Sequence, residues 1–394
     1  MQRREFLGFA CACCAAGWGS IARAQSESAA APGSVADWKV PAKFTRPDIA
    51  TDEGGLWALM DREETRMRRS PFLIRDQALR DYVQSVACRL GAEHCPDIRV
   101  YVMHTPMFNA SMAPNGMMQV WSGLLLRVEN EAQLAAVLGH EIGHYLERHS
   151  IEKLRDAKSR LAFGQMLGLL GLVGAVGQLA MLAGLLGYSR DQERAADRIG
   201  LQLMHRAGYD TGEAVKIWDN LLVELKARPD GDPAKNSPLF ASHPPAEERR
   251  ETLARLAAQY PGGVSNEQAL LDVIQPMRFD WIVDEIKRSQ ADESMALFTR
   301  MLAHKAQQPD VLFARGETQR LRAKGGDMEA AVSDYLAAAA AGGEPPETHR
   351  GLGMIYRSRG QAADEKASFA RYLEMAPGAP DAAMIKSYVE ELNG

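Results

Sequence analysis

Apolar positions follow two different periods along the first 260 residues of the chain. Where they recur every three or four positions, the period of an α-helix, the sequence predicts helices. Where apolar and β-branched residues alternate, it predicts strands. The expected helices cover 56–69, 78–90, 130–149, 189–207 and 211–227, with one more beginning at Pro244 and Pro245, and the expected strands cover 98–103 and 117–121. The order of these elements indicates a helix-dominated α+β domain at residues 51–262, built around a small sheet.

Capping residues strengthen two of the predicted helices. Asn130 is the N-cap of the helix predicted at 130–149, where its side chain can accept a hydrogen bond from a free backbone N–H group. Ser189 and Gln192 have the spacing of a capping box, and Gly208 follows the last turn of the same helix. We therefore expect both helices to begin at well-defined residues.

The chain changes character after residue 262. Residues 263–277 are interpreted as a linker, and residues 278–394 contain helix pairs at a spacing near the 34 residues of a tetratricopeptide repeat. The best copy places its small, aromatic and proline residues at the offsets of that repeat (Gly353, Tyr356, Phe369 and Pro377). An array of generic α-hairpins is the alternative. Either reading predicts an all-α solenoid whose concave face suits a peptide or a partner protein.

The first 24 residues have the pattern of an export signal. Arg3 and Arg4 precede an uncharged stretch at 6–22, and Ala22-Arg23-Ala24 has the small-x-small form of a cleavage site. The arginine pair favours the twin-arginine route over general secretion. We expect cleavage after Ala24, a linker at 25–50 and a periplasmic mature protein.

Composition and charge limit the classes of function that the chain can have. With 46% apolar and 25% charged residues, the 394-residue chain has an ordinary globular composition. A net charge of -5 gives no basic footprint, so we do not expect nucleic acid as a partner. After signal removal only Cys88 and Cys95 remain, which in an oxidising compartment can form a disulfide; two buried free thiols are the alternative.

The stretch GHEIGHYLERH, residues 139–149, contains the first candidate chemistry. His140 and His144 lie four positions apart, so on a helix both imidazoles project from one face and can reach one metal ion. Glu141 lies about 100° round the helix from His140, within reach of a metal-bound water, and is the candidate general base. His149 is too far round the helix to ligate the metal, and we interpret it as a surface residue or a charge near the helix end.

A third ligand is available in the helix that begins at Ser189. Zinc held by two histidines in a catalytic site commonly takes a carboxylate as its third protein ligand. Glu193 can supply it, and Asp197, one turn further on, can accept the free N–H of a zinc-bound histidine. The alternative is a solvated charged face formed with Arg190 and Arg194.

The segments HEIGH, SRDQERAAD and ASHPPAEERR, in this order, resemble the gluzincin metallopeptidases of the HtpX and CAAX prenyl protease type. The similarity is greatest to the periplasmic β-barrel assembly-enhancing branch of that family, which has a C-terminal tetratricopeptide module. The resemblance implies one Zn²⁺ per chain, with the three candidate ligands His140, His144 and Glu193, Glu141 as base and Asp197 as support.

The same resemblance places His243 and Arg249 over the zinc cleft, where both are candidate catalytic residues. Two roles remain open for His243. It can stabilise the oxyanion of the reaction, or it can occupy the open metal position as a plug that keeps the enzyme latent. The alternative to both catalytic roles is that His243 only helps to cap the following helix.

A run without charged residues, 161–189, is long enough for a transmembrane helix. A single span would leave His144 and Glu193 on opposite sides of a membrane, although both must reach the same ion. We therefore expect 161–188 to form an apolar helix or hairpin that lies over the protein and contacts the membrane surface peripherally.

Together these features predict an exported zinc endopeptidase that cleaves unfolded or misassembled envelope proteins. Residues 117–121 are the strand edge on which we expect an extended polypeptide substrate to add. The repeat domain is expected to bind the substrate or the outer-membrane assembly machinery. The alternative is a chaperone or assembly factor whose protease site is latent.

Overall fold

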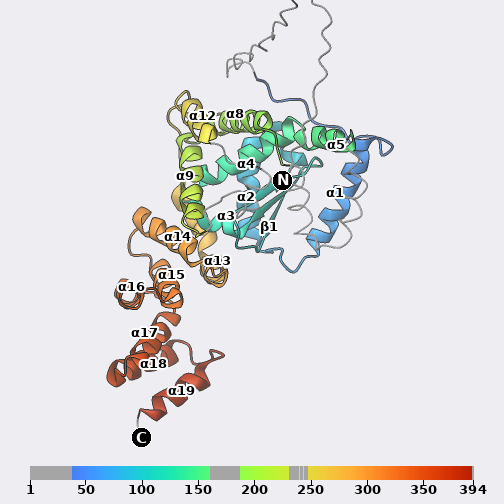
Figure 1. Ribbon diagram of the computed structural model, residues 1–394. Coiled ribbons are helices and arrows are strands. Elements are labelled where there is room, and N and C mark those ends of the chain that lie inside the picture. The colour runs from blue at the N-terminus through green and yellow to red at the C-terminus, as the bar shows by residue number, and fades with distance from the viewer. Residues whose placement is uncertain (1–37, 160–186, 230–238, 240–242, 244–246, 393–394) are drawn as a thin grey trace, which may run out of the picture. The chain divides into compact units, whose positions relative to one another are not determined.

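The computed structural model describes residues 38–159, 187–229, 239, 243 and 247–392 (Figure 1). The expected signal at 1–24, most of the linker at 25–50, Pro244 and Pro245, and nearly all of the apolar run at 161–188 lie outside these residues. The secondary-structure elements all belong to one compact unit, Lys39–Gly394. In the described part of the chain, no helix is both long enough and apolar enough to cross a membrane.

The described residues are mainly helical, with one small sheet. In chain order the elements are α1 (Asp52–Arg68), α2 (Gln77–Gly91), the 3₁₀ helix η2 (Ala92–Asp97), β1 (Arg99–Met103), β2 (Ala110–Met112), β3 (Met117–Trp121), α3 (Ser122–Arg127), α4 (Glu131–Leu146), α5 (His149–Ser159), α8 (Arg190–Arg206), α9 (Gly212–Lys226), α12 (Glu247–Ala257), α13 (Glu267–Lys287), α14 (Ala291–His304), α15 (Pro309–Arg322), α16 (Asp327–Ala341), α17 (Glu347–Ser358), α18 (Ala362–Met375) and α19 (Ala382–Glu391). The helix-dominated α+β class with a small sheet is confirmed.

The sheet has three strands in the order β1-β3-β2. β3 pairs in parallel with β1, with Arg99 opposite Met117, and antiparallel with β2, with Ser111 opposite Gln119. The expectation that residues 117–121 form an edge strand is wrong, because β3 is the central strand. Alternation in the sequence does not encode strand order, and the three-residue β2 is too short to give a recognisable pattern. β2, not β3, is an edge strand of this sheet.

The turn between β2 and β3 needs its glycine. Gly116 has φ +87°, and a Cβ atom there would meet the backbone oxygen of Asp97 at 2.0 Å. The N–H of Gly116 donates to the carbonyl of Ala113 and closes the turn. The turn expected at Pro114-Asn115-Gly116 is therefore present.

A disulfide closes the connection between α2 and β1. Cys88 and Cys95 are bonded, with their Cα atoms 4.5 Å apart. Between them His94 is fully buried, and its Nε2 lies 2.8 Å from the carbonyl oxygen of Pro41. The segment before α1 also contacts this region, because the ring of Phe44 packs against His94 and against Tyr145 of α4.

Helix α4 lies at the centre of the domain, and every one of its residues is buried. Asn130 caps it as expected, since its side chain accepts a hydrogen bond from the N–H of Gln133 at 2.9 Å. The helix ends at Leu146, not at His149 as expected. Arg148 has φ +59°, which breaks the helix and starts the separate helix α5.

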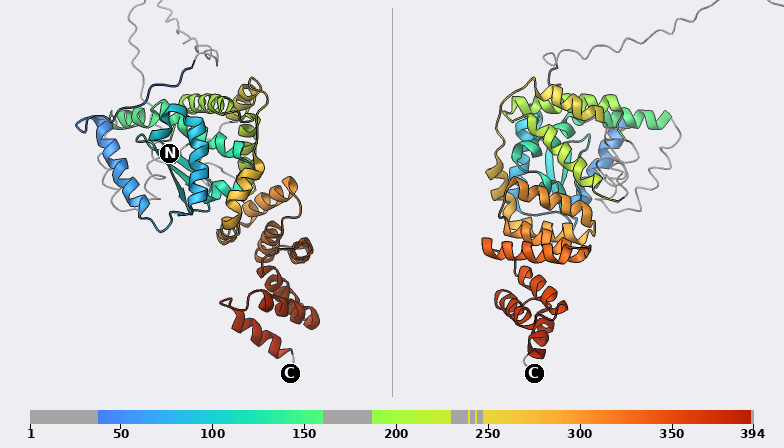
Figure 2. Two further views of the ribbon diagram at one scale, coloured as in Figure 1. Left: turned by 180° about the vertical axis from the view of Figure 1, so that it is seen from behind. Right: turned by 60° about the vertical axis from the view of Figure 1, so that its left-hand side comes forward.

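Helices α4 and α8 lie side by side with their backbones in close approach (Figures 1 and 2). A Cβ atom on Gly143 would lie 2.9 Å from the carbonyl oxygen of Ala196, and one on Gly200 would lie 3.0 Å from the backbone nitrogen of His140. Any larger side chain at these positions would force the helices apart. The small residues therefore bring α8 close enough for its acidic side chains to meet the histidines of α4.

Helix α8 begins as expected, with Ser189 and Gln192 forming both hydrogen bonds of a capping box. It ends at Arg206, and Gly208, at φ +81°, follows in the left-handed conformation. Much of the segment at 263–277 that we interpreted as a linker is helical instead, because α13 begins at Glu267.

The helices from α14 to α19 pack pairwise through small and aromatic residues. A Cβ atom on Gly316 of α15 would lie 3.0 Å from the ring of Tyr335 on α16. The same relation links Gly353 of α17 to Phe369 of α18, at 2.3 Å. Each glycine thus makes room for the aromatic ring of the following helix, which explains why these residue types recur along the C-terminal part of the sequence.

Candidate metal centre

Four buried side chains from separate parts of the sequence converge beside α4. The nitrogen and oxygen atoms that His140, His144, Glu193 and His243 can offer to a metal all lie within 4.8 Å of one another. The Nε2 atoms of His140 and His144 are 3.1 Å apart, and Nδ1 of His243 lies 3.2 Å from the former. Oε1 of Glu193 is 2.9 Å from Nδ1 of His243 and 3.4 Å from Nε2 of His144. All three predicted ligands and His243 are therefore neighbours.

Asp197 fixes the orientation of His140. Its Oδ1 lies 2.9 Å from Nδ1 of His140. In the tautomer that a metal ligand requires, the proton sits on Nδ1, where it is donated to the carboxylate, and the lone pair of Nε2 faces the other ligands. Asp197 and His140 thus lie in the contact that their positions on the two helices predict.

Arg249, from α12, holds both carboxylates of α8. Its guanidinium donates two hydrogen bonds of 2.7 Å to the oxygens of Asp197 and pairs with Oε2 of Glu193 at 2.8 Å. The ring of Trp218 on α9 lies under the guanidinium, 4.1 Å from its Cζ atom. The predicted site residue Arg249 thus contacts the candidate ligand Glu193 and the neighbouring carboxylate of Asp197.

His149 differs from its expected position on the surface. Only 5% of the residue is exposed, and its Nδ1 lies 2.9 Å from Nδ1 of His144. The turn at Arg148 directs the chain back towards α4, whereas a continuous helix would have turned His149 away. Its ring nevertheless lies outside the four-residue cluster, as the helix geometry had indicated.

Tyr188 covers the centre from the start of α8. Its ring stacks on the imidazole of His144, with the centroids 3.7 Å apart and the planes inclined by 19°. The Nζ atom of Lys153 also lies over the ring of Tyr188, 3.1 Å from its centroid. Burial lowers the pKa of this lysine to about 7.

Glu141 is buried next to the cluster without joining it. Its Oε1 receives no hydrogen bond from any residue that the structure describes, and Nε2 of His243 is 3.5 Å away. Burial raises the pKa of the Glu141 carboxyl, although His243 and His140 act in the opposite direction. A buried acceptor of this kind suits a proton-transfer role at the centre.

Charge balance keeps the other carboxylates ionised. Burial alone would raise the pKa of Glu193, but His243 and Arg249 outweigh it and hold that pKa well below its usual range. The pKa of Asp197 is likewise lowered, because Arg249 and His140 offset its burial. Burial lowers the pKa of His144 well below its usual value, so its imidazole is neutral and has a lone pair to offer.

The residues present fit a zinc ion. Imidazole nitrogens and one carboxylate are the donors typical of catalytic zinc sites. In a tetrahedral site with Zn–N bonds of about 2.0–2.1 Å, ligand nitrogens lie about 3.3 Å apart, close to the 3.1 Å between the two Nε2 atoms. A cation between the two buried Nε2 atoms would accept a lone pair from each imidazole.

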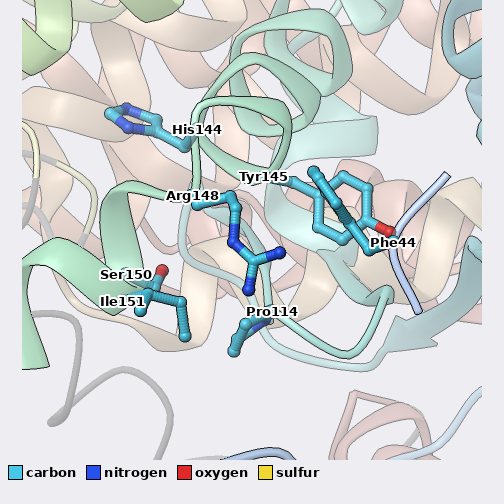
Figure 3. A pocket seen from close by; sticks show the side chains of 7 residues that line it. All are labelled: Phe44, Pro114, His144, Tyr145, Arg148, Ser150 and Ile151. Carbon is cyan, nitrogen blue, oxygen red and sulfur yellow. The ribbon is translucent and has the colours of Figure 1, made fainter. Parts of the chain in front are cut away.

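A small pocket lies at the end of α4, on the His144 side of the turn to α5 (Figure 3). Its lining comes from the segment before α1, the β2–β3 turn, α4 and α5: Phe44, Pro114, His144, Tyr145, Arg148, Ser150 and Ile151. The guanidinium of Arg148 lies over the ring of Phe44, 4.6 Å from its centroid. Residues before α1 therefore contribute to the surroundings of a candidate ligand.

Comparison with known proteins agrees with this chemistry. Residues 73–257 match the model of peptidase family M48. Over 152 residues the chain is 33% identical to the mitochondrial metalloendopeptidase OMA1 of Schizosaccharomyces pombe, covering 38% of this chain and 44% of that protein.

Bacterial relatives match a longer part of the chain. Identity is 26% over 237 residues to a putative beta-barrel assembly-enhancing protease of Vibrio cholerae, and 27% over 239 residues to the beta-barrel assembly-enhancing protease of Escherichia coli K12. Each of these matches covers 55% of this chain and 48% of the relative. The chain thus spans less than half the length of the curated relatives it matches. Residues 73–257 therefore form a metallopeptidase domain of the M48 type.

Proposed function

We propose that this protein is an exported zinc endopeptidase that cleaves unfolded or misassembled envelope proteins. The observation that carries the proposal is the buried donor cluster of His140, His144 and Glu193, beside which Oε1 of Glu141 accepts no hydrogen bond from any described residue. The three donors come from two helices held in close contact, so the site is rigid before any substrate arrives. Rigid placement of ligands and base is what metal-assisted hydrolysis requires.

Glu141 would move the protons of the reaction. A bound zinc ion would polarise the scissile carbonyl of the substrate and lower the pKa of a water molecule. Glu141 accepts the proton of the attacking water and returns it to the amine that leaves. Burial raises the pKa of its carboxyl, which makes it a better acceptor than an exposed glutamate.

Arg249 and Asp197 would act through the ligands. Asp197 keeps the lone pair of His140 Nε2 towards the centre, and Arg249 holds Asp197 and Glu193 in place. We propose that Arg249 is a positioning residue, because its guanidinium is engaged by both carboxylates.

The edge strand β2 is the proposed docking site for the substrate backbone. β2 packs against α4, and β3 pairs with it on one side only. An extended peptide that adds to an edge strand is held through main-chain hydrogen bonds. Such pairing is independent of side chains, which suits a protease for unfolded chains of varied sequence.

Export and the envelope as the place of action are supported by the N-terminal signal pattern and by the bacterial relatives, whose names refer to β-barrel assembly. The OMA1 relatives are named as mitochondrial proteins. The C-terminal helical pairs are proposed to bind the substrate or a partner of the outer-membrane assembly machinery, and the apolar segment 161–188 to contact the membrane peripherally.

Metal removal tests the proposed chemistry. We expect the purified protein to contain one zinc per chain and to cleave an unfolded model substrate. A chelator should abolish cleavage, and added Zn²⁺ should restore it. Metal content by mass spectrometry and the rate of substrate loss are the measurements. Cleavage that persists in metal-free protein would overturn the proposal.

A latent protease is the second candidate function, and the position of His243 favours it. Its Nδ1 lies 3.2 Å from Nε2 of His140, so it is placed to act as a fourth ligand. A fixed fourth ligand fills the position that catalytic zinc leaves for water. The protein would then serve mainly as a chaperone or assembly factor until the segment around His243 moves.

The substitution His243→Ala separates the two functions. If His243 plugs the centre, we expect cleavage to accelerate several-fold, because a ligand position opens while three ligands remain. If His243 stabilises the oxyanion instead, cleavage should slow by about 10²- to 10³-fold. The initial rate on an unfolded substrate, at equal zinc content, decides between these outcomes. An unchanged rate would remove His243 from either role.

A further inference from the structure

We propose that His149 is a positioning residue for the metal centre and fixes His144 in the way that Asp197 fixes His140. The inference rests on the proposed function, since it assigns a second supporting residue to the same zinc site. Nδ1 of His149 lies 2.9 Å from Nδ1 of His144, and both residues are buried, at 5% and 1% exposure. At that distance one nitrogen donates a hydrogen to the other.

The direction of this hydrogen bond follows from the position of the other nitrogen of His144. Nε2 of His144 lies among the ligands, 3.1 Å from Nε2 of His140 and 3.4 Å from Oε1 of Glu193. A metal ligand needs a lone pair at that atom, so the proton of neutral His144 resides on Nδ1. His149 must then accept through an unprotonated Nδ1 and carry its own proton on Nε2.

The chain makes an unusual turn to bring His149 there. Arg148, directly before it, has φ +59°, a conformation that residues other than glycine rarely adopt. Two contacts hold Arg148 in this state. Its guanidinium lies over the ring of Phe44 (Figure 3). It also forms an ion pair with Glu53 of α1. The segment before α1 and α1 itself therefore stabilise the turn that carries His149.

Both histidine ligands of α4 thus have an acceptor behind them. For His140 it is the carboxylate of Asp197, and for His144 it is a second imidazole. The neutral acceptor avoids adding a negative charge to a site that already contains Glu193, Asp197 and Glu141. Loss of such an acceptor usually lowers metal affinity or activity by about 10- to 100-fold, because the ligand ring can rotate and change tautomer.

Two substitutions at one position test the role. His149→Ala removes the acceptor, and we expect zinc affinity in chelator competition, or kcat at saturating zinc, to fall by about 10- to 100-fold. His149→Asn places an oxygen on Cγ where histidine has Nδ1, so an acceptor is restored. The Asn variant should recover to within a few-fold of the parent. The visible absorption spectrum of the cobalt-substituted protein should change in the Ala variant and return in the Asn variant.

The control is His205→Ala, which removes an exposed histidine of α8 that stacks on Tyr260, away from the centre. Equal defects in the Ala and Asn variants would overturn the proposal, because they would show that His149 acts by filling space. Parent-like affinity, kcat and cobalt spectrum in His149→Ala would overturn it as well. Failure of the proposed function gives a different result: the parent protein itself would neither bind zinc nor cleave the substrate. That result is seen before any variant is made.

Discussion

Glu141→Gln is expected to abolish cleavage of an unfolded substrate while the protein keeps its zinc. Glutamine has nearly the same shape as glutamate but cannot accept the proton of the attacking water. General-base catalysis contributes about 10²- to 10⁴-fold, so the rate should fall by at least two orders of magnitude. The ligands His140, His144 and Glu193 are untouched, and zinc content by mass spectrometry should equal that of the parent.

A matched substitution shows whether the loss is specific. Glu251→Gln makes the same change on the exposed face of α12 and should leave the rate unaltered. The buried Oε1 of Glu141 has no hydrogen-bond donor among the described residues, so the variant loses no hydrogen bond at that atom and should remain folded. If Glu141→Gln degraded the substrate at the parent rate, the assignment of the general base would have to be abandoned.

Short-range sequence patterns were sufficient to locate much of the site. The spacing of His140, Glu141 and His144 requires only that residues 139–146 be helical, and α4 covers them. Glu193 and Asp197 follow a capping box that the sequence displays at Ser189 and Gln192. Local rules therefore placed both helices and identified which side chains share a face.

The close approach of the two helices also has a signal in the sequence. Gly139 and Gly143 on α4 are spaced like Ala196 and Gly200 on α8, so each helix presents two small residues one turn apart. In the structure these residues face each other and let the backbones meet. That pairing of small residues was the available signal that Glu193 and Asp197 would reach the histidines.

Other parts of the site depend on contacts that no local pattern contains. A continuous helix through residue 149 would place His149 at the surface. The left-handed conformation of Arg148 ends that helix, and it depends on Phe44 and Glu53, which lie about a hundred residues earlier. Trp218 and Tyr188 reach the centre only through tertiary packing. The order of the strands likewise depends on tertiary pairing, which explains the wrong edge assignment for β3.

No local pattern indicates the buried charge cluster at the end of α3, because its members are far apart in the sequence. Arg127, only 2% exposed, donates to Glu224 of α9 at 2.8 Å and to Glu285 of α13 at 2.9 Å. Glu293 of α14 is 3.5 Å away. Most of the segment 263–277, which we interpreted as a linker, thus belongs to α13, and ion pairs join this helix to the peptidase domain.

Arg127→Leu is expected to destabilise the protein by about 3–5 kcal/mol, since breaking a buried ion pair leaves uncompensated charges behind. Burial would raise the pKa of Glu285, but Arg127 and Arg288 at present hold it below its usual value. Its stabilising contribution is therefore present at neutral pH and is lost as the pH falls through the lowered pKa. In the variant, protonation of Glu285 at low pH removes the buried charge that lacks its Arg127 partner. The difference in unfolding free energy between parent and variant should therefore become smaller as the pH falls. Denaturant unfolding at pH 7 and below measures this difference.

The double variant Arg127→Leu, Glu285→Leu should regain part of the lost stability, because it removes one of the stranded carboxylates together with its partner. Arg80→Leu is the matched control: its side chain is half exposed, and among the described residues it forms an ion pair only with the exposed Asp81, so little change is expected. Unfolding of Arg127→Leu at the parent denaturant midpoint would contradict the prediction. A large loss of unfolding free energy that is confined to the Arg127 variant and depends on pH would show that ion pairs hold α9 and α13 together. Because α9 carries Trp218, these ion pairs would also support the ring that lies under Arg249.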